Sequence, residues 1–158
     1  MLENRGFSLI ELVVGLLIVS ILFFFALPFS LSMMQKNQLE VVKNEIISAI
    51  HFAKTTSVLR GLPLVLAPLP QADNWSAGML LYVDNDKHEF NEKSELIYEW
   101  HWKHPGINVS WQGLYTKNYL LFSTTLQSRA LSGHFIISNK QGNRVQLIVN
   151  RLGRIRTA

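Results

Sequence analysis

The chain has 158 residues and a formal net charge of +4 at pH 7, although charged residues make up only 16% of it. This length fits one domain of ordinary size, and an apolar content of 48% excludes an intrinsically disordered chain. The absence of cysteine excludes a disulfide framework, a thiolate zinc site and a cysteine nucleophile.

The apolar excess lies near the N-terminus. Residues 7–27 form a long, mostly apolar run in which Glu11 is the only ionisable side chain. A helix of this length spans the bilayer core of roughly 30 Å, so the run predicts a transmembrane segment. The alternative is a secretory signal peptide, but its apolar core is about 7–15 residues long and is followed by a small-residue cleavage site. Flanking cations, Arg5 on one side and Lys36 and Lys43 on the other, leave the orientation open.

Glu11 is unusual because a carboxylate inside an apolar helix costs a few kcal/mol on insertion scales. No cation lies one helical turn away, since the neighbouring positions hold Phe7, Ser8, Val14 and Gly15. Two interpretations therefore stay open. The carboxyl group is either protonated or directed to the membrane interface, or it pairs with a cation on another chain.

Residues 28–60 predict a second, amphipathic part of this helix. Pro28 is expected to kink the helix rather than end it, because helix-compatible residues follow. An apolar stripe with spacings of three and four residues predicts packing on a domain. Gly61 and Pro63 favour a helix end near Arg60. The stripe consists of Leu39, Val42, Ile46, Ala49 and Ala53.

The remaining residues, 61–158, predict a β-rich head. Short apolar or alternating segments separated by turn residues are typical of an antiparallel sheet or a small sandwich. The expected fold class is therefore α+β, with a long N-terminal helix packed on the sheet. The seven predicted strands are Leu62–Ala67, Gly78–Val83, Glu95–Trp100, Ile107–Trp111, Tyr119–Phe122, His134–Ser138 and Arg144–Val149.

The segment from Arg5 to Leu12, RGFSLIEL, resembles the processing signature of type IV pilins and type II secretion pseudopilins. The resemblance implies that a prepilin peptidase cleaves between Gly6 and Phe7, which removes the leader 1–6, and then methylates the new N-terminus. It implies that Glu11 meets the N-terminal amine of a neighbouring pilin subunit. It also implies a single-pass inner-membrane protein whose head lies in the periplasm and which enters a pilus or pseudopilus.

Further motifs are similar to the GspH/FimT group of minor pilins and pseudopilins. They are the helix end LRGLP at residues 59–63, the WSAG step at residues 75–78, and the GRIR tail at residues 153–156. The FimT-like branch of that group, which is associated with type IV pili and DNA uptake, carries a Gly-Arg-any-Arg tail. Many relatives carry two cysteines at positions that correspond to Ala67 and Ala158, so this chain lacks that disulfide.

Motif searches give no catalytic site, so we expect no enzymatic activity and no cofactor. His101 and His104 lack the spacing of a zinc motif and are expected on opposite faces of a strand end. The loop beginning Asp84-Asn85-Asp86 partly matches a calcium-binding pattern, but Glu89 stands where that pattern requires glycine. A solvated acidic loop is the favoured interpretation.

Charge is distributed unevenly along the head. Residues 73–99 contain seven acidic residues and two lysines, whereas residues 100–158 contain eight cations and no acid. Arginine binds phosphate in bidentate fashion, so this tail suits a polyanion such as DNA, bound without sequence preference. A solvated strand edge is the structural alternative. The predicted DNA-binding residues are Arg151, Arg154 and Arg156, extended by Arg144 and Lys140 if the preceding hairpin lies alongside.

Aromatic residues could add to such a site by stacking on unpaired bases, although their alternation in strands favours packing in the core. They are Trp100, Trp102, Trp111, Tyr115 and Tyr119. The FimT-like resemblance, together with the basic tail, implies a minor type IV pilin that binds DNA during natural transformation. The alternative is a minor pseudopilin of a type II secretion system with a structural role at the initiation or tip of the pseudopilus.

Overall fold

The computed structural model describes residues 8–72, 74–123 and 131–158, with the side chains of residues 26–36 left out. The chain divides into two compact units, Met1–Asn37 and Gln38–Ala158, and one helix, α1 (Leu9–Arg60), contributes to both. Pro28 lies inside α1, so the helix continues through it as predicted. In the described part of the chain, no helix combines the length and hydropathy needed to cross a membrane, and the span predicted for residues 7–27 is not confirmed.

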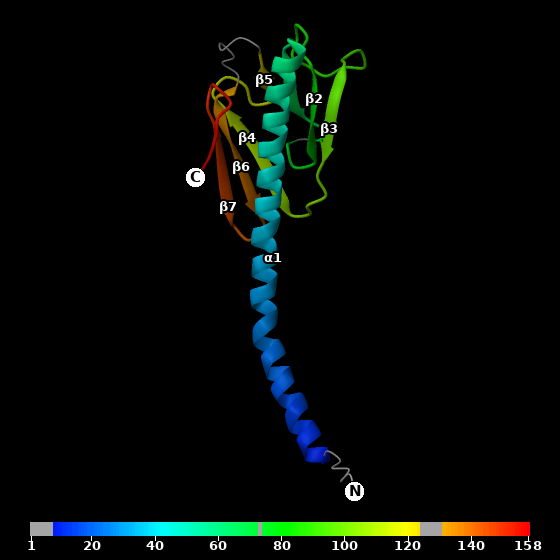
Figure 1. The fold of residues 1–158 in the computed structure, drawn as a ribbon, viewed down its shortest axis with the longest axis vertical. Helices are drawn as coiled ribbons and strands as arrows, with labels where there is room; N and C mark the ends of the chain where they lie inside the picture. Colours follow the sequence, from blue (N-terminus) through cyan, green and yellow to red (C-terminus); the bar gives the residue numbers. More distant parts are fainter. Residues whose placement is uncertain (1–7, 73, 124–130) are drawn as a thin grey trace. The chain divides into compact units, whose positions relative to one another are not determined.

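The head, residues 38–158, contains the end of α1 and two four-stranded antiparallel sheets. The first sheet has the order β3-β2-β1-β5 and the second the order β4-β6-β7-β8. In Figure 1, β2 and β3 lie on one side of α1, and β4, β6 and β7 lie on the other. The strands are β1 (Leu64–Pro68), β2 (Gly78–Val83), β3 (Leu96–His101), β4 (Ile107–Gly113), β5 (Leu120–Phe122), β6 (Gly133–Asn139), β7 (Arg144–Val149) and β8 (Ile155–Thr157).

The apolar stripe of α1 forms the centre of the head. All five predicted stripe residues are buried, and so is Ile50 beside them. They pack in one cluster with residues of both sheets, because each sheet turns alternate side chains toward the helix. Phe135 of β6 packs against two tryptophans of this core. Its ring centroid lies 4.6 Å from that of Trp111 on β4 and 5.2 Å from that of Trp75, which precedes β2.

The junction between helix and sheet is formed by Ser57 and Gly61. The Ser57 side chain is 1% exposed, and its hydroxyl lies 2.9 Å from the Leu62 carbonyl and 3.2 Å from the Phe122 carbonyl. Gly61 has a φ of +66°, the left-handed conformation expected of a residue that ends a helix. This confirms the predicted helix end at Arg60 and places β1 and β5 beside it.

Each of the seven predicted strands overlaps a strand of the structure. The eighth strand, β8, was not predicted, because its three residues include Arg156 and show no apolar alternation. It forms by pairing with β7, and Ala158 N then donates a 3.0 Å hydrogen bond to the Gln146 carbonyl. Backbone pairing therefore holds the C-terminal tail on the head without a disulfide.

Candidate nucleic-acid interface

The turn between β7 and β8 carries Arg151 and Arg154. Asn150 builds this turn, because its side-chain oxygen accepts hydrogen bonds of 2.9 Å from the amides of both Leu152 and Arg154. Gly153 N donates a 2.9 Å bond to the Asn150 carbonyl, and the φ of Gly153 is +71°. A short asparagine side chain and a glycine are the residue types that this tight turn requires.

Lys54 of α1 contacts the turn between β7 and β8. Its Nζ donates a 2.7 Å hydrogen bond to the Leu152 carbonyl. A Cβ at Gly153 would lie 3.4 Å from Cδ of Lys54, and Gly153 is buried. The lysine stem therefore covers this glycine, whose left-handed φ of +71° forms the turn.

Three arginines share the outer face of the second sheet. Leu147 and Val149 of β7 are buried, so they face inward. Side chains alternate along a strand, so Ile148 and Arg144 face outward. Arg156 lies opposite Ile148 in the ladder, and Arg154 lies opposite Asn150. Along a strand, alternate residues are about 6.6 Å apart, which is the expected separation of Arg154 and Arg156.

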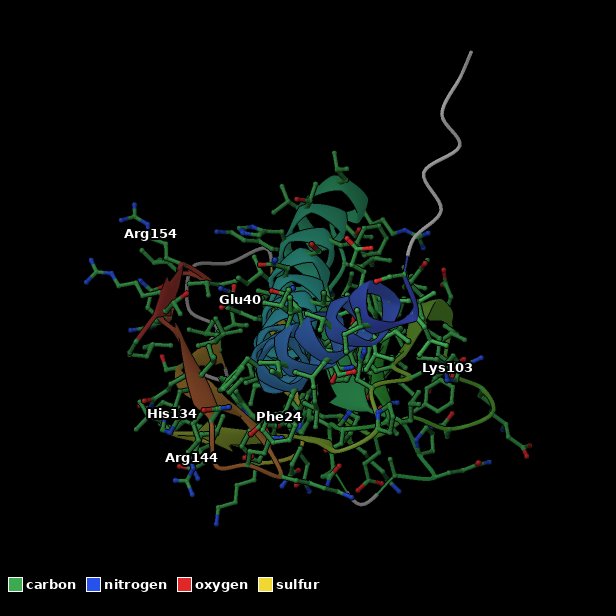
Figure 2. The ribbon with its side chains drawn as sticks, turned by 90° about the horizontal axis from the view of Figure 1, so that it is seen from below. Phe24, Glu40, Lys103, His134, Arg144 and Arg154 are labelled. Carbon is green, nitrogen blue, oxygen red and sulfur yellow. The ribbon has the colours of Figure 1, made fainter. Side chains whose placement is uncertain are left out.

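Lys140 and Arg144 lie at the other end of β7. Lys140 is in the turn of the β6–β7 hairpin, and Arg144 pairs with Ser138 at the start of β7. Asn150, which lies opposite Arg154, is six positions after Arg144, so the row from Arg144 to Arg154 is about 20 Å long. Figure 2 shows Arg144 and Arg154 extending outward on the same side of the head and Lys103 on the other side. The hairpin therefore lengthens the basic surface and does not concentrate it.

The basic surface has no counter-ion of its own in the described part of the chain. The five predicted residues are exposed, and none of them takes part in an ion pair there. The cations that do form pairs, such as Arg60 with Glu95 at 2.9 Å, lie elsewhere on the head. Lys54 is a sixth cation at this surface, which sequence analysis missed because it lies 98 residues from its partner.

The aromatic residues are divided between core and surface. Trp102 and Trp111 are in the core, at 8% and 5% exposure. Trp100 and Tyr119 are half-buried, and Tyr115 is exposed in the β4–β5 connection. Stacking on bases is therefore excluded for the two core tryptophans and sterically open for Tyr115.

The acidic loop between β2 and β3 is organised by its own side chains. His88 Nδ1 lies 2.7 Å from an Asp84 oxygen, and the Asn85 side chain bonds to backbone groups of Lys87 and Glu89. In the described residues no group of three or more metal-binding side chains was found. His101 faces Glu99 at 3.0 Å and His104 faces Glu45 at 3.6 Å, so the two rings have separate partners.

Tyr82 lies beneath this loop. Its hydroxyl donates a 2.9 Å hydrogen bond to the His88 carbonyl. Burial raises the pKa of Tyr82 well above its ordinary value near 10, and the negative charges of Asp84 and Glu89 raise it further. The hydroxyl therefore stays neutral and ties the acidic loop to the sheet.

At the N-terminus, the predicted processing residues Gly6 and Phe7 and the leader 1–6 lie outside the described residues. Glu11 is described, and it caps the start of α1. Ser8 N donates a 3.0 Å bond to the Glu11 carboxylate, and Glu11 N lies 3.3 Å from the Ser8 hydroxyl. This reciprocal pair is a capping box, which gives Glu11 a local partner that sequence analysis missed.

Comparison with known proteins agrees with this architecture. Residues 1–27 match the family model described as the prokaryotic N-terminal methylation motif, and residues 43–153 match the model described as type II transport protein GspH. The chain belongs to the GspH family. The predicted membership of the type IV pilin and pseudopilin class is confirmed, and the family and fold are those of filament-building structural proteins.

The fold of this GspH-family protein is similar to that of a solved minor pilin. The crystal structure of the type IV minor pilin FimU of Pseudomonas aeruginosa superposes with a TM-score of 0.60 and 14% sequence identity. The alignment covers 78% of this chain and 90% of FimU. No match was found among curated protein sequences. The predicted α+β fold is confirmed. The methylation motif fits processing by a prepilin peptidase and anchoring in a membrane, and the pilin family implies contact with other pilin subunits.

Proposed function

We propose that this GspH-family protein is a minor pilin that binds the DNA backbone, without sequence preference, through the basic surface of its second sheet. The observation that carries this proposal is the outward row of arginines on β7, β8 and their turn, which has no acidic partner among the described residues. Guanidinium groups in such a row can each bind a phosphate.

The dimensions of the row suit a nucleic-acid strand. Its length of about 20 Å corresponds to the rise of about six nucleotides of one strand in a duplex. Arg154 and Arg156 are the centre of the proposed site, and Arg151 adds a third cation at the turn. Arg144 and Lys140 then contact more distant phosphates. In a pilus, this arrangement supplies the DNA-binding step of natural transformation.

Phosphate contacts of this kind predict a steep dependence on salt, because each neutralised phosphate releases counter-ions. A soluble fragment 36–158 is suitable for titration, since all buried core residues of the described chain lie between Leu39 and Val149. Replacing Arg151, Arg154 and Arg156 with alanine should lower the slope of log K against log salt by about three and greatly weaken binding.

The matched control removes three positive charges from loops on either side of β3, outside the basic surface. Lys87, Lys93 and Lys103 lie outside the basic surface, so their triple alanine variant has the same net charge as the arginine variant. It should bind DNA with close to the affinity of the unmodified fragment. Equal losses in both variants would show that binding follows net charge alone and would contradict the site.

The match to the type II transport protein GspH favours a second candidate, a pseudopilin with a structural role in secretion. Both candidates need processing between Gly6 and Phe7 and assembly through Glu11, and they differ in the use of the basic surface. A deletion strain separates them. Loss of DNA uptake with normal secretion supports the pilin, and loss of secreted enzymes with normal uptake supports the pseudopilin.

A further inference from the structure

The turn between β6 and β7 has the same hydrogen-bond pattern as the turn between β7 and β8. The Asn139 side-chain oxygen accepts bonds of 3.1 Å and 3.0 Å from the amides of Gln141 and Asn143, as the Asn150 oxygen does in the other turn. A glycine with a positive φ follows each asparagine by three residues. In both turns the residue directly after the asparagine is a cation, here Lys140. The backbone therefore presents a cation in the same way at each end of β7.

Lys140 borders a hollow of about 470 Å³ at its end of the second sheet. The lysine stem lies over Gly106, because a Cβ at that glycine would be 3.6 Å from Cδ and Cε of Lys140. Apart from Ile107, the side chains described as lining the hollow are polar, and none of these is acidic. The polar residues of this hollow are Asn74, Ser76, Asn108, Ser138, Asn139 and Lys140.

Hydrogen bonds orient the two amide groups at the centre of the hollow. The Ser76 hydroxyl accepts a 2.8 Å bond from Val109 N and donates a 3.0 Å bond to Asn108 Oδ1. Asn74 Nδ2 donates to the same oxygen at 3.4 Å. Because Asn108 Oδ1 is the acceptor in both contacts, both protons of Asn108 Nδ2 are left for a further partner. Asn74 Nδ2 likewise retains one proton.

A row of polar side chains crosses the sheet from the hollow to β7. Asn108 pairs with Ser138, and Ser138 pairs with Arg144, so the three side chains share the outer face of the second sheet. Directly opposite side chains in such a ladder are about 5 Å apart. The row thus brings the Arg144 guanidinium close to the amide, hydroxyl and ammonium groups of the hollow. Donors of this kind, two of them charged, favour an anion with several oxygen atoms.

We propose that the hollow binds a phosphate group through Lys140 Nζ and the side-chain nitrogens of Asn74 and Asn108, with Arg144 beside them. A phosphate offers oxygen atoms to donors from different elements at once, and the cations balance its charge. A backbone phosphate of DNA and a free phosphate present the same chemistry to these donors. The inference rests on the proposed function, to which it adds an amide-lined phosphate site at the far end of β7.

Titration of the full chain in detergent micelles with inorganic phosphate tests the site. Ionic strength is kept constant with chloride, and heteronuclear NMR spectra follow the side-chain amides of Asn74 and Asn108. Both signals should shift in a saturable way. The side-chain amide of Asn118, which lies outside the hollow, should not shift. Absence of saturable shifts at Asn74 and Asn108 would overturn the proposal.

Variants identify the groups that bind phosphate. Asn108→Asp keeps an oxygen for the bonds from Ser76 and Asn74 but replaces the free donors with negative charge, so phosphate affinity should fall by about tenfold. Asn118→Asp adds the same charge outside the hollow and should change the affinity little. Equal losses in these two variants would show that binding follows net charge and would overturn the site.

Lys140→Met is a second test of the site. It keeps the apolar stem over Gly106 and removes the ammonium, so the fold should be preserved and phosphate affinity should fall by about tenfold. Unchanged affinity in both Lys140→Met and Asn108→Asp would contradict the proposed ligands.

A DNA duplex without terminal phosphates distinguishes the two sources of the phosphate. If the DNA backbone enters the hollow, the duplex should shift the Asn74 and Asn108 amides, and Asn108→Asp should weaken DNA binding. If only inorganic phosphate shifts these amides while the duplex binds at Arg154, the hollow takes a free phosphate and the proposed function stands.

The same titrations separate this site from the proposed function. If DNA binds but neither DNA nor inorganic phosphate shifts the two amides, the phosphate site is wrong and the proposed function stands. If inorganic phosphate binds in the hollow and the chain does not bind DNA, the phosphate site stands and the proposed function is wrong.

Discussion

Lys54 Nζ donates a 2.7 Å hydrogen bond to the carbonyl oxygen of Leu152, and this bond connects α1 to the turn that carries the arginines. The lysine stem also covers the buried Gly153. Helix and turn therefore support each other, although they lie far apart in the sequence. The position of the basic surface depends on this contact as well as on the β7–β8 ladder.

Replacement of Lys54 tests this support. Lys54→Met keeps the apolar stem but removes the donor, so the free energy of unfolding should fall by about 1 kcal/mol. Amide hydrogen exchange at Gly153 and Arg154 should become faster, because their turn loses its anchor. Lys54→Arg retains a donor and should change both quantities less. Unchanged exchange at the turn in Lys54→Met would contradict this role.

Gly153→Ala should destabilise the head. The substitution places a side chain on a backbone with a φ of +71°, and its new Cβ would lie in van der Waals contact with Lys54, 3.4 Å from Cδ. The expected loss is about 1–2 kcal/mol of unfolding free energy, measured by denaturant titration. Gly142→Ala is the matched control, since its φ is +87° and nothing lies within 4 Å of its added Cβ. If Gly142→Ala costs as much, the contact with Lys54 adds nothing.

Much of this fold follows from local sequence pattern, because alternation and helical spacing identify buried faces directly. The stripe on α1, its end at Arg60 and seven strands were predicted on that basis and confirmed. β8 was missed because its conformation depends on pairing with β7. The Ser8–Glu11 capping box was a readable motif that the apolar run around it obscured.

The geometry of the candidate site was less predictable than the fold. Sequence analysis identified the arginines but could not place Arg144 and Arg154 at opposite ends of β7, because that separation follows from strand register. Lys54 could not be identified at all. Its contact with Leu152 is a tertiary contact, and its position on α1 alone resembles that of any solvated lysine.

The arrangement of the row predicts unequal contributions to DNA binding. Arg154→Ala should weaken binding more than Arg144→Ala, because Arg154 has Arg151 and Arg156 as near neighbours while Arg144 lies about 13 Å along β7 from the level of Arg156. Each single variant should reduce the salt slope by about one if its phosphate contact is made. An equal effect of the two variants would indicate a dispersed surface and not one centred on the β7–β8 turn.

Tyr82 predicts a loss of stability at high pH. Burial, followed by the charges of Asp84 and Glu89, raises the pKa of Tyr82 in the folded head. Above pH 10 the unfolded chain releases this proton while the folded chain retains it, so the unfolded state gains stability. The unfolding free energy should fall by up to about 1.4 kcal/mol per pH unit there.

The Tyr82→Phe variant identifies the source of this pH dependence. It removes the ionisable hydroxyl and the hydrogen bond to the His88 carbonyl, so stability at pH 7 should fall by about 1 kcal/mol. Between pH 10 and 11, the unfolding free energy of Tyr82→Phe should fall less than that of the unmodified head. Parallel declines in urea titrations at the two pH values would assign the effect to other groups.

Glu11 has two possible roles, capping α1 and pairing with another subunit, and one substitution separates them. Glu11→Gln can still accept the hydrogen bond from Ser8 N, so the start of α1 should be preserved. It removes the negative charge that would attract the N-terminal amine of a neighbouring subunit. We therefore expect Glu11→Gln to be processed normally and to be depleted from sheared filaments.

Ser8→Ala has the opposite character, because it keeps the charge and removes the hydroxyl of the capping box. It should enter filaments at a near-normal level, measured by immunoblotting of the same fractions. Equal depletion of the two variants would mean that assembly requires the capped helix start, and equal incorporation would remove Glu11 from the assembly contact.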